Sequence, residues 1–233
     1  SEPDGGMYAA LNKGFAHTRG EIMGWLNSDD ILLPGALHSV GEIFAQFPDV
    51  AWLSSLALQT WNPAGRCIGV SSIEGYSRAA FLDGGYLPGA RRHYGWIPQE
   101  STFWRRSLWE KAGARLDDSL KLAGDFELWA RFFFHAELVG TPTPIGGFRT
   151  HPAQKSQAMM NYLGEACPLL ASAALALAAP VALSPILAGP AHAFFGFGRI
   201  VYDPSNYAQN VLTAARTLEQ INNQITSLQN EAQ

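Results

Sequence analysis

Residues 166–198 contain no Asp, Glu, Lys or Arg, and alanine and leucine dominate this run. Residues 1–165, in contrast, mix charged, glycine and aromatic residues as a globular α/β domain does, and after Arg199 the chain is rich in Asn, Gln and Thr. A folded domain needs charged surface positions and apolar core positions along its whole length. The three compositions therefore predict three segments, whose bounds are set at residues 1–156, 157–193 and 194–233 by the motifs described below.

Helical and strand patterns alternate within the first segment. Met7, Ala10, Leu11 and Phe15 have helical spacing, and the apolar run 22–26 that follows is typical of a buried strand. Further helices are expected at 34–47, 107–111 and 126–134, with Pro34 in the first turn of the first of them, and a further strand at 50–58. Such alternation predicts an α/β fold with a mainly parallel sheet and helices on its faces.

Composition excludes some classes of function. The formal net charge of −4 leaves no basic field for nucleic acid, so no nucleic-acid partner is expected. Cys67 and Cys167 lie far apart and match no metal or redox spacing, so they are interpreted as inert thiols.

The uncharged run has features of an export signal. Residues 169–188 are long enough to cross a bilayer, but prolines at 180, 185 and 190 make them a poor permanent span. The run ends in Ala191-His192-Ala193, which is similar to a signal-peptidase site. We therefore expect residues 166–198 to pack on no part of the first segment; the alternative is a buried hydrophobic hairpin.

Beyond that run, apolar residues step by three and four and form a short heptad seam. The seam predicts a C-terminal helix with a helical partner for residues 211–228, or else an amphipathic helix on a larger body. Its members are Val211, Ala214, Leu218, Ile221, Ile225 and Leu228.

The strongest chemical signal is the sequence Trp25-Leu26-Asn27-Ser28-Asp29-Asp30, in which a predicted strand runs into two carboxylates. Ligands of α/β sheets bind beyond the carboxyl ends of strands, and Mg²⁺ or Mn²⁺ bound to phosphates takes one or two carboxylates. Taken alone, such a pair more often begins a turn or caps a helix.

Five further short stretches accompany this pair in the same chain. Ser1-Glu2-Pro3-Asp4-Gly5-Gly6 and Leu11-Asn12-Lys13-Gly14 precede it, and Pro98-Gln99-Glu100-Ser101 follows it. Then come Ala123-Gly124-Asp125-Phe126-Glu127-Leu128-Trp129 and Phe148-Arg149-Thr150-His151. With these motifs in this order, residues 1–156 resemble the later two-thirds of a family 2 glycosyltransferase with the GT-A fold.

The resemblance implies roles for individual residues. Asp30 would coordinate Mn²⁺ or Mg²⁺ on the donor diphosphate, with Asp29 beside it and His151 as a further metal or diphosphate ligand. Asp125 would be the catalytic base, although an aspartate there can simply cap the helix that follows. Residues of the donor and acceptor sites would be Asp4, Lys13, Asn27, Asp29, Gln99, Glu100 and Arg149.

The implied function is inverting, metal-dependent transfer of a sugar (hexosyltransferase-like) from a nucleotide-sugar donor to a glycan or other hydroxyl acceptor. The early nucleotide-binding strands of that family are not found in this sequence, so the transfer is expected to be impaired.

Residues 195–233 resemble the mature N-terminus of TrbJ-like conjugal-transfer proteins, and the alternative function is a secreted helical component of a type IV secretion system. The expected location is cytoplasmic for the transferase part, near the inner membrane, with an exported-type tail.

Overall fold

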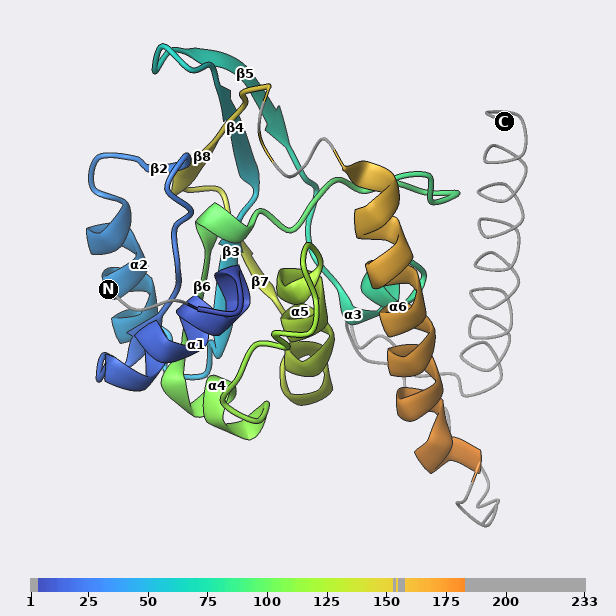
Figure 1. The fold of residues 1–233 in the computed structure, drawn as a ribbon. Helices are drawn as coiled ribbons and strands as arrows, with labels where there is room; N and C mark the ends of the chain where they lie inside the picture. Colours follow the sequence, from blue (N-terminus) through green and yellow to red (C-terminus); the bar gives the residue numbers. More distant parts are fainter. Residues whose placement is uncertain (1–3, 153, 155–157, 183–233) are drawn as a thin grey trace, which may run out of the picture.

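The computed structural model of the protein describes residues 4–152, 154 and 158–182. Helices and strands alternate through most of this range, and the fold is mixed α/β (Figure 1). The helices are α1 (Met7–His17), α2 (Ala36–Gln46), α3 (Arg78–Leu82), η1 (Gln99–Ser101), α4 (Arg106–Lys111), α5 (Gly124–His135) and α6 (Met159–Ala182). The strands are β1 (Ile22–Met23), β2 (Ile31–Leu32), β3 (Trp52–Ser55), β4 (Ala57–Trp61), β5 (Cys67–Ser72), β6 (Thr102–Arg105), β7 (Val139–Thr141) and β8 (Gly146–Arg149).

The strands form two sheets, ordered β1-β6-β3-β7 and β2-β8-β4-β5. Only the β3–β7 and β4–β8 pairs are parallel, whereas β1–β6, β3–β6, β2–β8 and β4–β5 are antiparallel. The α/β class is as expected, but within the described residues the expectation of a mainly parallel sheet is wrong. The pattern of alternation does not reveal that β6 inserts antiparallel between β1 and β3, or that β4 and β5 pair as a hairpin.

The first sheet is buried on both faces. Trp52 and Trp104 point to one face and join the larger core, while their neighbours Leu53 and Phe103 point to the other, as the two-residue period of a strand requires. On that second face Ala36, Val40 and Phe44 of α2 complete a smaller core. Helices therefore cover both faces of this sheet (Figure 1), and all four side chains of β3 are buried.

Several expected elements are confirmed with shifted ends. The strand expected at 22–26 is only two residues long, so Trp25 and the residues after it form a loop. The strand expected at 50–58 breaks at Leu56 into β3 and β4, which belong to different sheets. Helix α2 begins at Ala36 after a left-handed Gly35, so Pro34 lies just outside it.

Helix α6 contradicts the expectation that residues from 166 onward pack on nothing. Leu163, Ala166, Leu170, Ala173 and Ala174 are buried in the larger core, and the helix contacts α5 and α3 (Figure 1). These residues follow a helical period. The sequence does not reveal which side of the helix is buried, because the other side is also rich in alanine and leucine. The described part of the run is a packed helix rather than an isolated segment, and the rest of the run, in which a hairpin would turn back, lies outside the described residues.

The expected heptad helix and the Ala191-His192-Ala193 site lie outside the described residues. Within residues 4–152, 154 and 158–182, no helix combines the length and the apolar character that crossing a membrane requires.

Candidate active site

The loop after β1 carries the carboxylate pair, and its geometry is fixed by side-chain amides. Asn27 Nδ2 donates to Asp30 Oδ2 at 3.1 Å and to Gln99 Oε1 at 3.0 Å. Gln99 Nε2 in turn donates to the carbonyl of Trp25 at 2.6 Å. These bonds tie the loop to η1, so that Asn27 and Gln99 hold the Asp30 carboxylate in one orientation.

Asp30 is buried, with 8% of its surface exposed, and its second oxygen accepts the backbone N–H of Arg149 at 3.1 Å. Burial raises the pKa of Asp30, and the hydrogen bonds from Arg149 and Asn27 oppose that rise. Both oxygens of Asp30 therefore already accept hydrogen bonds from the protein.

Asp29 turns the other way, toward the end of β8. Its Oδ2 lies 2.9 Å from His151 Nε2. The backbone N–H of His151 donates to Gln154 Oε1 at 2.6 Å, which fixes the turn that carries the imidazole. Residues 122 positions apart in the chain thus form one polar pair.

Asp125 lies at the second position of α5, whose N-cap is Ala123, so it is not the N-cap that the alternative interpretation made it. Its Oδ1 accepts the backbone N–H of Phe126 at 2.8 Å. Burial raises the pKa of Asp125 to about 6, against the lowering effect of that hydrogen bond. A carboxyl with a pKa near the working pH is suited to accept a proton in catalysis.

Glu100 lies in η1 and lines the same pocket as Asp30 and Asp125, with 6% of its surface exposed. Burial raises its pKa to about 8, and the neighbouring carboxylates of Asp30 and Asp125 contribute to the rise. At neutral pH this side chain is therefore mostly protonated and can donate a hydrogen bond.

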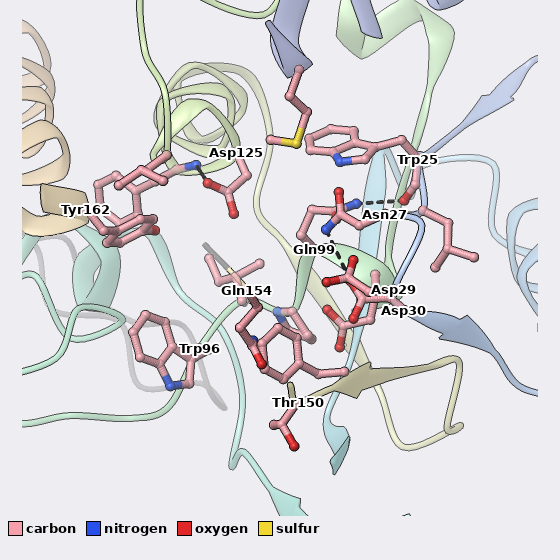
Figure 2. A pocket seen from close by; sticks show the side chains of 18 of the residues that line it. Trp25, Asn27, Asp29, Asp30, Trp96, Gln99, Asp125, Thr150, Gln154 and Tyr162 are labelled. Carbon is pink, nitrogen blue, oxygen red and sulfur yellow. Dashed lines mark hydrogen bonds between the residues drawn. The ribbon is translucent and has the colours of Figure 1, made fainter. Parts of the chain in front are cut away.

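A single pocket of about 1160 Å³ collects these groups. Figure 2 shows Asp125 on one side of it, Asp29 and Asp30 on another, and Gln99 and Asn27 between them. Seven residues predicted from the sequence line it: Asn27, Asp29, Asp30, Gln99, Glu100, Asp125 and His151.

Three predicted residues lie elsewhere. Asp4 and Lys13 are exposed and are not among the described residues that line the pocket. Arg149 contributes its backbone N–H to Asp30, while its side chain is not part of the lining.

The sequence interpretation missed the part of the wall formed by α6. Met159 and Tyr162 line the pocket, and Tyr162 packs edge-to-face on Trp96 with ring centroids 6.3 Å apart (Figure 2). Trp96 also lines the pocket, whereas Trp104 and Trp109 belong to the core. No motif identifies Met159 or Tyr162, because only the packing of α6 brings them to the site.

Asp29, Asp30 and His151 are the residues of the pocket that could hold a divalent cation. In the part of the chain that the structure describes, no three His, Cys, Asp or Glu side chains gather as a metal-binding group. Asp29 Oδ2 and His151 Nε2 are hydrogen-bonded to each other at 2.9 Å, so a cation that takes its remaining ligands from a diphosphate and water would have to replace that hydrogen bond.

Comparison with known proteins agrees with this geometry. Residues 1–59 match the model of glycosyl transferase family 2. The chain is 29% identical over 149 residues to uncharacterized glycosyltransferases of Mycobacterium tuberculosis strains CDC 1551 and H37Rv, a match that covers 62% of this chain and 49% of each relative. The chain thus spans about half the length of the curated relatives it matches.

Solved structures show the likeness in fold. A crystal structure of S. aureus TarS 1–349 in complex with UDP-GlcNAc has a TM-score of 0.56 and 11% identity, and the match covers 93% of this chain and 54% of that one. The complex of the same protein with UDP has a TM-score of 0.50 and 16% identity over 73% of this chain and 46% of that one. The resemblance to family 2 glycosyltransferases and the GT-A-like α/β fold are confirmed.

Proposed function

With a family 2 glycosyltransferase fold as the premise, we propose that this chain transfers a sugar from a nucleoside-diphosphate sugar to a hydroxyl acceptor, with inversion and with the aid of a divalent cation. The observation that carries the proposal is the pocket itself. A polar end formed by Asp29, Asp30 and His151 faces the same space as the half-buried carboxyl of Asp125, whose pKa is raised to about 6.

Support for the donor class comes from the structural relatives. TarS 1–349 has been crystallised with UDP and with UDP-GlcNAc, and its fold is similar to that of this chain. The size of the pocket, about 1160 Å³, is also sufficient for a nucleoside diphosphate sugar and part of an acceptor.

Asp30, Asp29 and His151 would hold the cation. A cation bound there supplies positive charge that stabilises the departing diphosphate. Asn27 and Gln99 keep the Asp30 carboxylate in place, and the bulk of Trp25, Trp96 and Tyr162 helps to exclude water from the pocket.

Asp125 would accept the proton of the acceptor hydroxyl while that oxygen attacks the anomeric carbon. A single displacement of this kind inverts the anomeric centre. Protonated Glu100, which lines the pocket, would donate a hydrogen bond to a sugar hydroxyl.

Titration calorimetry of the 233-residue chain tests the proposal. We expect UDP and UDP-GlcNAc to bind in the presence of Mn²⁺, and to bind about tenfold or more weakly in EDTA or in Asp29→Asn. Asp49→Asn is the matched control, because Asp49 is exposed and not among the lining residues.

Two results would count against parts of the proposal. Equal affinity in Mn²⁺ and in EDTA would remove the metal dependence. Absence of binding by either nucleotide in Mn²⁺ would remove the donor class.

A further inference from the structure

The start of α5, which carries Asp125, has no cap of its own. Its N-cap is Ala123, which has no side-chain hydrogen-bond acceptor, and the approach from Lys121 to Ala123 is irregular. The first N–H groups of a helix have no partner within the helix and need acceptors from elsewhere.

Tyr8 supplies an acceptor for the first helical N–H, and Glu165 accepts from the N-cap Ala123 and the residue before it. The hydroxyl of Tyr8, on α1, accepts the N–H of Gly124 at 2.9 Å and donates to the carbonyl of Leu122 at 2.8 Å. The carboxylate of Glu165, on α6, accepts the N–H groups of Leu122 and Ala123, each at 2.9 Å.

Glu165 also accepts the N–H of Lys121 through both oxygens, at 3.1 and 3.2 Å. Burial alone would raise the pKa of Glu165, but the hydrogen bonds from Ala123, Leu122 and Lys121 outweigh it and hold the pKa below its ordinary value. The side chain is therefore charged at neutral pH, and charge-assisted hydrogen bonds of this kind are the stronger ones.

We infer that Glu165 is a positioning residue for the proposed catalytic base: through the backbone of residues 121–123 it fixes the start of α5 and so the place of the Asp125 carboxyl in the pocket. This inference rests on the proposed function for the role of Asp125. It also assigns α6 a part in the site, since the helix that bears Glu165 contributes Tyr162 and Met159 to the pocket wall.

A positioning residue and a residue that only stabilises the fold differ in what their substitution changes. A side chain that only stabilised the fold would lower the melting temperature without changing the Asp125 carboxyl in the native state. A positioning residue changes the local N–H groups and the environment of that carboxyl while the rest of the domain stays folded.

The experiment compares Glu165→Ala and Glu165→Gln with the wild-type chain and needs no substrate. Amide hydrogen exchange is followed at residues 121–123, and the Asp125 carboxyl is titrated by carbon NMR, with Asp125→Asn to assign its signal. Glu110→Ala is the matched control, because Glu110 is an exposed glutamate on α4.

In Glu165→Ala we expect the three amides to exchange about tenfold or more faster. We also expect the pKa of Asp125 to fall from about 6 toward the ordinary aspartate value of about 4, because a loosened loop admits water. Tyr8, Tyr162 and Glu100 are the ionisable groups on which the charge of Asp125 acts, and all three are present in every variant.

Glu165→Gln keeps one oxygen that can accept from residues 121–123, but it removes the negative charge and the second oxygen. Faster exchange at these three amides, though less than in the alanine variant, is therefore expected, and this variant carries the test if the alanine variant does not fold. Unchanged exchange at all three amides in the glutamine variant, or an unchanged Asp125 pKa in a folded alanine variant, overturns the inference.

A turnover assay adds a second readout. UDP release from UDP-GlcNAc should slow about tenfold in kcat in Glu165→Ala, with the donor KM within about twofold, because the donor end of the pocket lies on other elements. If wild-type protein neither binds nor turns over the donor, the proposed function fails, whereas the exchange and titration results still decide whether Glu165 positions Asp125.

Discussion

At the scale of single residues, the site depends on carboxyl groups placed in different surroundings. Asp29 is paired with His151, Asp30 accepts two hydrogen bonds from the protein, and Asp125 opens toward the pocket from the first turn of α5. The same functional group is thereby suited to hold charge in one place and to accept a proton in another.

The role of Asp125 can be separated from its effect on the helix. Asp125→Asn keeps a side-chain oxygen near the Phe126 N–H, so we expect folding to be retained and donor affinity to stay within about threefold. Turnover should fall by about 10²-fold or more, the usual scale for a lost general base. Calorimetry and a UDP-release assay measure the two quantities, and turnover that survives together with a lower melting temperature would contradict the catalytic role.

Gly124 shows how closely α1 approaches α5. A Cβ at this position would lie 2.5 Å from the ring of Tyr8, so Gly124→Ala must displace the tyrosine that holds the loop before Asp125. We expect a loss of about 1–3 kcal/mol in the free energy of unfolding, the usual scale for overpacking. The measurement is urea denaturation.

Gly164→Ala is the matched control for that substitution. Gly164 lies inside α6 and a Cβ there would meet nothing within 4 Å, so alanine should raise stability by up to about 1 kcal/mol. Equal effects of the two substitutions would show that the Tyr8 contact is not the cause.

At the scale of elements, α6 is the part of the chain whose structure differs most from the expectation. One side of it carries Leu163, Ala166 and Leu170 into the core shared with α5, and Glu165 reaches the loop before α5. Leu175, in contrast, is 68% exposed. The helix therefore has an inner and an outer side even though both are rich in apolar residues.

Two leucines of α6 test this arrangement. Leu170 is 2% exposed, so Leu170→Ala should lower the free energy of unfolding by about 2–5 kcal/mol, whereas Leu175→Ala should change it by no more than about 0.5 kcal/mol. Thermal and urea denaturation measure both. Similar small effects for the two variants would mean that α6 does not pack on the domain, as the composition alone suggested.

At the scale of the whole molecule, the pocket depends on groups from distant parts of the chain. The loop after β1, η1, the start of α5, the end of β8 and α6 all contribute to its wall (Figure 2). Bringing carboxyls together in this way affects the stability of the entire fold, because burial and mutual repulsion both favour their protonated forms.

The effect of a buried carboxyl on the stability of the fold can be measured at Glu100. Its pKa is raised in the folded state to about 8, so the folded state is favoured below the unfolded pKa of about 4.5 and loses that advantage as the pH rises through about 8. We expect the free energy of unfolding of the wild-type chain to decline between pH 5 and pH 9 by an amount on the order of a few kcal/mol. The melting temperature should fall with it.

Glu100→Gln cannot ionise and should flatten that decline, whereas Glu110→Gln, at an exposed position, should leave it unchanged. Melting curves across this pH range give the comparison. Parallel curves for wild type and Glu100→Gln would contradict a raised pKa at Glu100.

The sequence by itself determined the local features of this protein. Periodicity predicts α1, α2 and α5 to within a few residues, and the order of short motifs led to the family resemblance and to most residues of the pocket. These features are readable because each depends on neighbours in the chain: a helical stripe, a strand followed by carboxylates, an acidic helix start.

Only the tertiary structure decided which strands pair antiparallel, and that Asp29 meets His151. It also decided that α6 belongs to the core, because a helix rich in alanine and leucine on both sides gives no sequence contrast between inside and outside. Which side is buried depends on the surface of α5 and α3 that it meets, and that surface exists only once the chain has folded. For the same reason Glu165, the last charged residue before the uncharged run, gave no sign in the sequence of its contact with the loop before Asp125.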